Sequence, residues 1–126
     1  MPPGGGNYVY LGEGNGLAVL DVSDRSQPRQ VGGLPMRTYD DVTSIAVNGN
    51  TAYLANGDNL RVVNVTDPTS PMLVSTLDMT GTRVVAAAGS YAYVMAGTWL
   101  RVVDVANPAS PTLVGSHDLQ AMGTSI

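Results

Sequence analysis

Cysteine and lysine are both missing from this chain of 126 residues. Without cysteine there can be no disulfide bond and no thiolate metal site, and the redox compartment stays open. Because lysine is absent, the positive charges come from six arginines alone. The chain also has ten acidic residues, so its net charge is −4. Nucleic-acid binding needs clustered positive charge to neutralise phosphates. The composition therefore argues against a nucleic-acid partner.

Long apolar segments are missing as well. No apolar run approaches the roughly 18 residues that a membrane-spanning helix requires, so we expect no membrane span. The chain starts with MPPGGG, which has neither the basic nor the apolar region of a secretory signal. Because a trimmed or mature chain would start in the same way, the localisation stays open.

Groups that perform acid–base or metal chemistry are scarce. His117 is the only histidine and Glu13 the only glutamate. A zinc or iron site needs several convergent imidazole, thiolate or carboxylate ligands. No Gly-x-Ser-x-Gly motif marks a nucleophilic serine. We therefore expect no catalytic residues, no metal site, no cofactor and no enzyme activity, with His117 in a solvent-exposed loop.

One sequence motif occurs three times in the chain. Its core is Leu17-Ala-Val-Leu-Asp21, which returns as Leu60-Arg-Val-Val-Asn64 and Leu100-Arg-Val-Val-Asp104. The repeat leucines are 43 and then 40 positions apart, and each follows a tyrosine by 7 positions and precedes a proline by 11. This period is typical of a four-stranded propeller blade. One such unit cannot bury its own apolar faces, so tandem copies must stack.

The middle unit defines the expected strands. Residues 42–47 and 51–55 flank Asn48-Gly49-Asn50, a hairpin signal, and turns then lead to strands at 60–65 and 72–77. The third unit repeats this at 83–88, 91–95, 100–105 and 112–116. The sequence predicts an all-β fold, a β-propeller of four-stranded antiparallel blades with three blades per chain.

The chain ends complete the predicted domain plan. Residues 1–7 form a flexible start rich in glycine and proline, and three repeats follow at about 8–41, 42–82 and 83–123. The first unit opens at Asn7-Tyr-Val-Tyr-Leu11, which matches the second strand of the pattern. Residues 124–126 resemble the start of a first strand, as in Thr43-Ser44-Ile45. We expect them to begin the strand that completes the open blade, beside residues 8–11 of the same chain or of a partner.

The units resemble the LVIVD repeat, a family whose tandem copies are similar to β-propeller blades. The resemblance covers about residues 8–126. The motif departs from the family pattern at Ala18, Arg61 and Arg101, where valine is usual, and at Asn64, which replaces aspartate. The resemblance implies a scaffold without agreed catalytic residues, often in secreted or surface-attached bacterial proteins.

Three blades cannot close a ring, because propellers typically have four to eight. An open arc exposes two apolar faces, and hiding both on a second copy is worth on the order of 10 kcal/mol or more before association costs. The sequence therefore predicts a homo-oligomer, with a head-to-tail homodimer forming one six-bladed ring as the preferred form. Filaments, a larger ring, or a longer repeat array that includes this chain are the alternatives.

The repeated polar positions are interpreted as structural. Asp21, Asn64 and Asp104 stand near strand ends before turns, where short polar side chains accept bonds from backbone N–H groups. Arg61 and Arg101 occupy matching positions in two repeats. We expect them in ion pairs between adjacent blades or on solvent-facing edges.

Candidate ligand-binding residues lie in loops that emerge on one face. Trp99 is the only tryptophan and stands at a loop end, where an aromatic side chain can bind a sugar or a protein. The most polar loop contains Arg37, Tyr39, Asp40 and Asp41. A scaffold that binds a protein partner through this loop face is the preferred function. A glycan-binding, lectin-like propeller is the alternative, and an enzyme with an active site in the channel ranks third.

Overall fold

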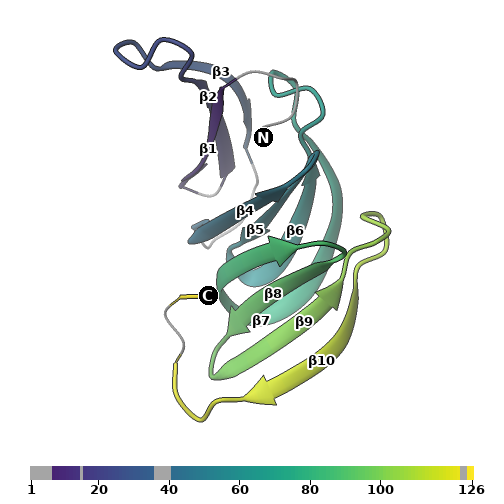
Figure 1. Ribbon diagram of the computed structural model, residues 1–126. Helices are drawn as coiled ribbons and strands as arrows, with labels where there is room; N and C mark the ends of the chain where they lie inside the picture. Colours follow the sequence, from purple (N-terminus) through teal and green to yellow (C-terminus); the bar gives the residue numbers. More distant parts are fainter. Residues whose placement is uncertain (1–6, 15, 36–40, 123–124) are drawn as a thin grey trace.

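The computed structural model describes residues 7–14, 16–35, 41–122 and 125–126. These residues form ten strands in two antiparallel sheets and no helix (Figure 1). The first sheet has the order β1-β2-β3, and the second has the order β10-β9-β8-β7-β6-β5-β4. The strands are β1 (Tyr8–Glu13), β2 (Gly16–Asp21), β3 (Arg29–Leu34), β4 (Ser44–Asn48), β5 (Thr51–Ala55), β6 (Gly57–Asn64), β7 (Met72–Ala88), β8 (Tyr91–Ala96), β9 (Trp99–Asp104) and β10 (Thr112–Asp118).

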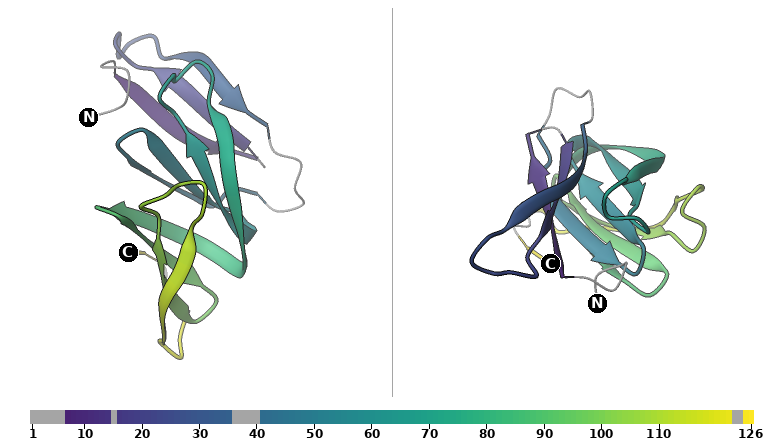
Figure 2. Two further views of the ribbon diagram at one scale, coloured as in Figure 1. Left: turned by 90° about the vertical axis from the view of Figure 1, so that its right-hand side faces the viewer. Right: turned by 90° about the horizontal axis from the view of Figure 1, so that it is seen from above.

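The strands fall into three groups that follow the sequence repeats. We call β1–β3 the first repeat, β4–β6 with residues 72–78 the second, and residues 82–88 with β8–β10 the third. The repeats follow one another along the molecule, from the first sheet to β10 (Figure 2). This all-β, antiparallel arrangement is compatible with a propeller-like fold.

Strand β7 corrects one sequence prediction. Two strands, 72–77 and 83–88, were expected with a loop between them, but β7 runs through both as one strand. Thr82 explains the continuity, because it lies opposite Gly57 of β6 and also opposite Ala96 of β8. Its Oγ1 accepts a bond from the Gly57 N–H (2.9 Å) and donates to the Asn59 carbonyl (3.0 Å). The second and third repeats therefore share a strand and form one continuous sheet.

The last strand of each repeat contains a β-bulge. The register shifts by one residue opposite Val19 and Leu20 in β2, opposite Val62 and Val63 in β6, and between Leu113 and Gly115 in β10. The residue left unpaired is a valine each time: Val31, Val74 and Val114. A bulge at a sheet edge increases the local twist and hinders pairing with another chain.

Two apolar clusters fill the seams between repeats. Between the first and second repeats, Leu17 and Val19 pack with Leu54 and Val63. Between the second and third repeats, the buried residues are Tyr53, Ala55, Leu60, Val62, Met79, Val85, Ala92, Val94, Ala96, Val103 and Val105. Alternate residues of β5 and β6 enter opposite seams, as the strand period of two requires. The second repeat is therefore buried on both faces.

The first strands of neighbouring repeats lie side by side and are tied by side chains. Thr43 Oγ1 donates to the Arg83 carbonyl (2.7 Å), and Asn48 Nδ2 donates to the Gly89 carbonyl (3.0 Å). Ser44 Oγ accepts a bond from the Val85 N–H (3.0 Å). We call this first strand of a repeat the inner strand; it is β4 in the second repeat and residues 82–88 in the third.

Two predictions concern the ends of the chain: that the first repeat lacks its first strand, and that residues 124–126 pair beside it. The first repeat begins at β1, which matches β5 and β8, so it has no inner strand among the described residues. Ser125 and Ile126 lie outside any strand, and Thr124 lies outside the described residues. Pairing of residues 124–126 beside β1 therefore stays a prediction. His117 was expected in a loop, which is wrong: it is an exposed residue of β10, because the outer strand extends to Asp118.

Candidate interaction surfaces

Trp99 is the best-placed of the residues expected to bind a ligand. It begins β9 beside the turn that follows β8, and 38% of its surface is exposed. The Arg101 guanidinium lies over its ring, 5.2 Å from the ring centroid, in a cation–π contact. The sequence analysis missed this pair, although residues two apart on a strand share a face.

Of the four candidate residues in the polar loop, the structure describes Asp41. Asp41 is exposed. Arg37, Tyr39 and Asp40 lie outside the described residues. Their participation in a site with Trp99 stays a prediction.

A shallow pocket lies beside Arg101, between the second and third repeats. It is lined by Leu77, Asp78, Met79, Thr80, Arg101 and Leu113. Arg101 Nη1 donates to Ser116 Oγ (3.0 Å), whereas the matching Arg61 donates from Nε to Asn59 Oδ1 (3.1 Å). Within the part of the chain that the structure describes, neither arginine forms an ion pair. Trp99 occupies the position of Asn59, so the third repeat differs from the second in both shape and polarity here.

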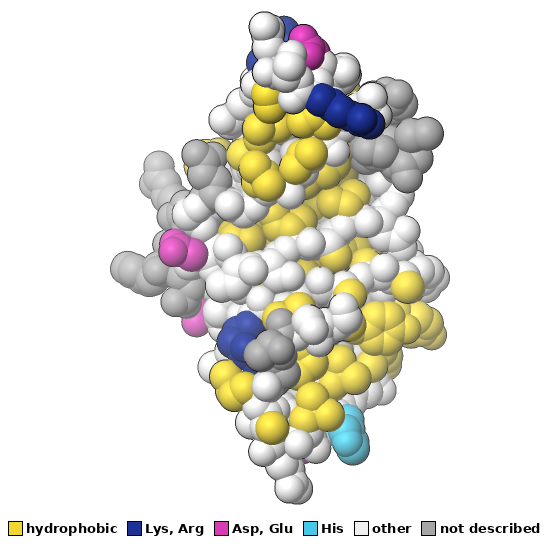
Figure 3. Space-filling model, turned by 60° about the vertical axis from the view of Figure 1, so that its left-hand side comes forward, with side chains coloured by type: hydrophobic (Ala, Val, Ile, Leu, Met, Phe, Trp, Pro, Cys, Tyr) yellow, Lys and Arg dark blue, Asp and Glu magenta, His cyan; other side chains and the backbone are white. Residues whose placement is uncertain are grey.

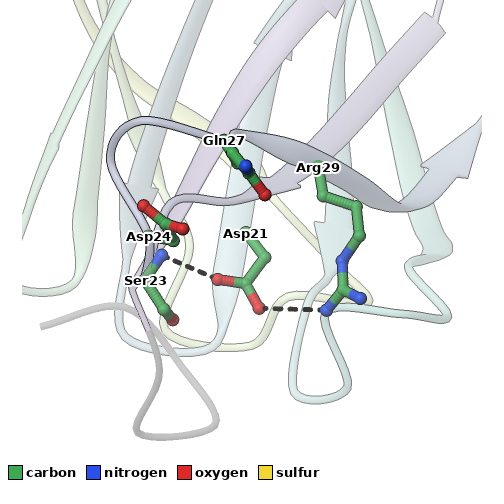
Figure 4. A pocket seen from close by; sticks show the side chains of 5 residues that line it. All are labelled: Asp21, Ser23, Asp24, Gln27 and Arg29. Atoms are coloured by element: carbon green, nitrogen blue, oxygen red, sulfur yellow. Dashed lines mark hydrogen bonds and ion pairs between the residues drawn. The ribbon is translucent and has the colours of Figure 1, made fainter.

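A second pocket lies at the turn between β2 and β3 (Figure 4). Asp21 Oδ1 accepts a bond from the Ser23 N–H (2.8 Å), and Asp21 Oδ2 lies 3.7 Å from Arg29 Nη2. Hydrogen bonds from Ser23 lower the pKa of Asp21, and the Arg29 charge adds a smaller effect. Asp24 and Gln27 complete the lining.

The same turn recurs in the other repeats, which identifies this second pocket as structural. Asn64 Oδ1 accepts from the Thr66 N–H (2.8 Å), and Asp104 Oδ1 accepts from the Ala106 N–H (2.9 Å). The prediction that these side chains hold turns is therefore confirmed. Among the described residues, no three His, Asp or Glu side chains are grouped so that they could hold a metal ion. Nor does the described part of the chain include a helix long and apolar enough to cross a membrane.

The outward face of the first repeat is apolar and exposed. We call it the leading face; it comprises Val9, Leu11, Leu20 and Val22. Val9 is 39% and Leu11 44% exposed, and Leu20 and Val22 are half-buried. The matching positions of the second repeat, Ala52, Leu54, Val63 and Val65, are fully buried against the first repeat. The leading face thus has the residue types of a buried seam without its neighbour.

The outward face of the third repeat is also apolar and also lacks a neighbouring repeat. We call it the trailing face; it comprises Tyr93, Met95, Leu100 and Val102. Met95 is buried, and the other three are half-buried. Their counterparts in the second repeat, Tyr53, Ala55, Leu60 and Val62, are at most 4% exposed. On the side of the molecule that Figure 3 presents, broad apolar areas carry few charged side chains.

Comparison with protein families accounts for all three repeats. The LVIVD repeat matches at residues 5–34, 40–79 and 81–118, which together are most of the chain. This chain belongs to the LVIVD repeat family. The three LVIVD matches coincide with the three strand groups, which confirms the expected repeat number and the expected family.

A solved structure shares the fold of these LVIVD repeats. It is described as the crystal structure of a functionally unknown protein from Desulfotomaculum acetoxidans DSM 771. The two superpose with a TM-score of 0.70 at 16% sequence identity, over 82% of this chain and 35% of that chain. This chain thus spans about a third of the length of that protein. The comparison with curated proteins finds no match.

Proposed function

We propose that this chain is a non-enzymatic β-propeller scaffold whose copies assemble head to tail into a closed ring, six blades from two copies, and that the ring binds a protein partner through one loop face. The observation that carries the proposal is the match between the two end faces and the two buried seams. Each end face has apolar residues at the registers where the second repeat has the apolar residues of a buried seam.

The internal seams show which face meets which. Inside the chain, Tyr53, Leu60 and Val62 pack against the third repeat, whose contributing residues include Val94 and Val103. Between copies, Tyr93, Leu100 and Val102 of one trailing face would meet Val9, Leu11 and Leu20 of the next leading face. Burying apolar surface of this kind contributes about 25 cal/mol per Å² before association costs. Because the two faces differ, the contact is head to tail, and such contacts close into rings when the rotation allows.

The mass in solution tests assembly. Light scattering at micromolar concentration is expected to give twice the chain mass of 13.0 kDa. Leu100→Arg places a charge on the trailing face and should give a monomer, because burying an unpaired charge is strongly unfavourable. Val114→Arg is the matched control, since Val114 is 57% exposed in the bulge of the outer strand and lies on neither end face. A wild-type chain that stays monomeric would refute the ring.

The loop face is supported by Trp99, which is partly exposed, and by Asp41, which is exposed in another of the loops expected on that face. A tryptophan that is both partly exposed and held by an arginine is a rigid anchor of the kind that protein interfaces use. Trp99→Ala is therefore expected to abolish partner binding while the assembled mass stays unchanged.

Glycan binding is the second candidate, favoured by the partly exposed Trp99, whose cation–π partner Arg101 lines a pocket. Arg101 lies over one face of that ring, so a sugar would have to stack on the opposite face. Because the chain has one tryptophan, its fluorescence reports on this site directly. A sugar panel that leaves the emission unchanged would remove this candidate, whereas saturable quenching would favour it over a protein partner.

A further inference from the structure

The pocket beside Arg101 lies at the outer end of the seam between the second and third repeats. Residues 77–80 of β7 form one wall, and Arg101 of β9 and Leu113 of β10 form the other. The volume of the pocket is about 360 Å³, which falls within the range of small-ligand pockets. Neither wall belongs to the leading face or the trailing face, so the pocket does not depend on assembly.

Strand pairing places Arg101 on the face of the third repeat that turns toward the second. Arg101 lies opposite Val94 of β8, which is buried in the cluster between these repeats. Leu113 lies opposite Val103, another member of that cluster, and therefore shares the face. From the second repeat, Met79 is buried in the same cluster. Apolar side chains from both repeats thus line the pocket around the guanidinium.

Two opposite charges line the pocket without neutralising each other. The Trp99 ring and a bond from Nη1 to Ser116 Oγ (3.0 Å) hold the Arg101 guanidinium. Asp78 is exposed, and within the described ranges no ion pair joins it to Arg101 or joins Arg101 to another carboxylate. A fixed guanidinium suits a ligand carboxylate, because its N–H groups match both carboxylate oxygens. The Asp78 carboxylate can accept a bond from an N–H group of the same ligand.

The seam between the first and second repeats lacks this combination. Arg61 corresponds to Arg101, Asn59 to Trp99 and Pro35 to Asp78. Proline has no side-chain acceptor, and Arg61 donates from Nε to Asn59 Oδ1 (3.1 Å). The aromatic ring and the carboxylate therefore distinguish the pocket in the later seam, and Arg61 provides a matched control for Arg101.

We propose that this pocket binds an apolar C-terminal residue of a protein partner. Arg101 binds the terminal carboxylate, the apolar lining surrounds the side chain, and Asp78 accepts a bond from the backbone N–H. A C-terminal residue carries all three groups on one carbon atom, so a single small pocket can engage them together. This inference rests on the proposed binding of a protein partner at the loop face that carries Trp99, and it names the part of the partner that binds.

Peptide titrations test the carboxylate requirement. Trp99 is the only tryptophan, and the Arg101 guanidinium lies over its ring, so its emission reports on this pocket. The probes are acetyl-Gly-Gly-Leu with a free C-terminal carboxylate, the same peptide as its C-terminal amide, and free leucine. The acid is expected to shift the emission saturably. The amide should bind at least tenfold more weakly, because it lacks the charge-assisted bonds to Arg101.

Calorimetry on variants then assigns the groups that bind. Arg101→Gln should weaken the binding of the acid at least tenfold. Arg61→Gln removes the same charge at the matching position and should leave the affinity unchanged. Asp78→Asn keeps an acceptor oxygen for the peptide N–H and should change the affinity little, whereas Asp78→Ala should weaken the acid and the amide alike.

The proposal is overturned if the acid and the amide bind equally, if Arg61→Gln weakens the acid as much as Arg101→Gln does, or if neither peptide shifts the emission at millimolar concentration. Free leucine that binds more tightly than the peptide acid would assign the pocket to an amino acid and would also overturn it. None of these outcomes alters the assembled mass or the effect of Trp99→Ala on partner binding, so each is distinct from failure of the proposed function.

Discussion

Single polar side chains hold the turns before the last strand of every repeat. Asp67 Oδ1 accepts from the Thr69 N–H (3.0 Å) and from Thr69 Oγ1 (2.6 Å), and Asn107 Oδ1 accepts from the Ala109 N–H (3.1 Å) in the matching turn. Aspartate and asparagine therefore make the same bond at this position. The bond depends on an acceptor oxygen at the right distance, and a charge strengthens it.

The hydrogen bonds of Asp67 predict how the stability of the chain depends on pH. Hydrogen bonds from Thr69 lower the pKa of Asp67 below its ordinary value of 3.8 in the folded chain. Its stabilising contribution is therefore complete above about pH 4 and is lost as the pH falls through the lower, folded value. Thermal melts between pH 6 and pH 2 should show a smaller acid-induced loss for Asp67→Asn than for the wild type. At pH 7, Asp67→Asn should melt near the wild type and Asp67→Ala below it; an equal acid loss in Asp67→Asn would contradict the assignment.

Strand β7 connects two repeats, because residues 72–78 belong to the second repeat and residues 82–88 to the third. Gly81 lies between these two parts of the strand and has a φ of +81°. Its carbonyl accepts from the Gly97 N–H (3.0 Å), and a Cβ at this position would lie 3.1 Å from the Gly97 nitrogen. A side chain is therefore opposed both by the backbone conformation and by the neighbouring turn.

Gly81→Ala should consequently destabilise the chain more than an alanine at a glycine with free space around it. Gly89 is the matched control, because its φ is +58° and nothing lies within 4 Å of its Cβ position. We expect a loss of about 2–3 kcal/mol for Gly81→Ala and about 1–2 kcal/mol for Gly89→Ala. Urea unfolding measures both. Equal losses of unfolding free energy in the two variants would mean that the space around Gly81 is not restricted.

The three repeats are not equally attached to one another. The second and third share β7 and one sheet, whereas the first forms a sheet of its own and meets the second through apolar packing. Repeat proteins gain stability from each unit and from each interface between neighbours. Opening the first repeat breaks one interface and no strand pairing with β4–β10, so it is the easier motion.

Two core variants separate these interfaces. Leu54 is fully buried between the first and second repeats, and Leu60 is fully buried between the second and third. Each change to alanine should cost about 2–5 kcal/mol. Leu54→Ala should speed amide exchange in β2 and leave β8 almost unchanged, whereas Leu60→Ala should speed exchange in both β6 and β8. Uniform acceleration in the Leu54 variant would show that the three repeats unfold as one unit.

Much of the fold follows from the sequence, and the candidate sites follow less well. The hairpin of β4 and β5 was placed to within two residues, because Asn48-Gly49-Asn50 is a local turn signal. The turn roles of Asp21, Asn64 and Asp104 were also predicted correctly, since each bond spans two residues. The Trp99–Arg101 pair was missed, because the spacing shows a shared face but not that the guanidinium lies over the ring.

Repeat number, strand alternation and turn chemistry could all be read from the order of the residues, because each depends on neighbours a few positions apart or on a pattern that recurs. The continuity of β7 and the bulges at Val31, Val74 and Val114 required the folded chain. Each of these is set by the register between strands, which forms when seams pack and backbone groups find partners. Local preference does not encode register, and so these features depend on how the repeats pack against one another.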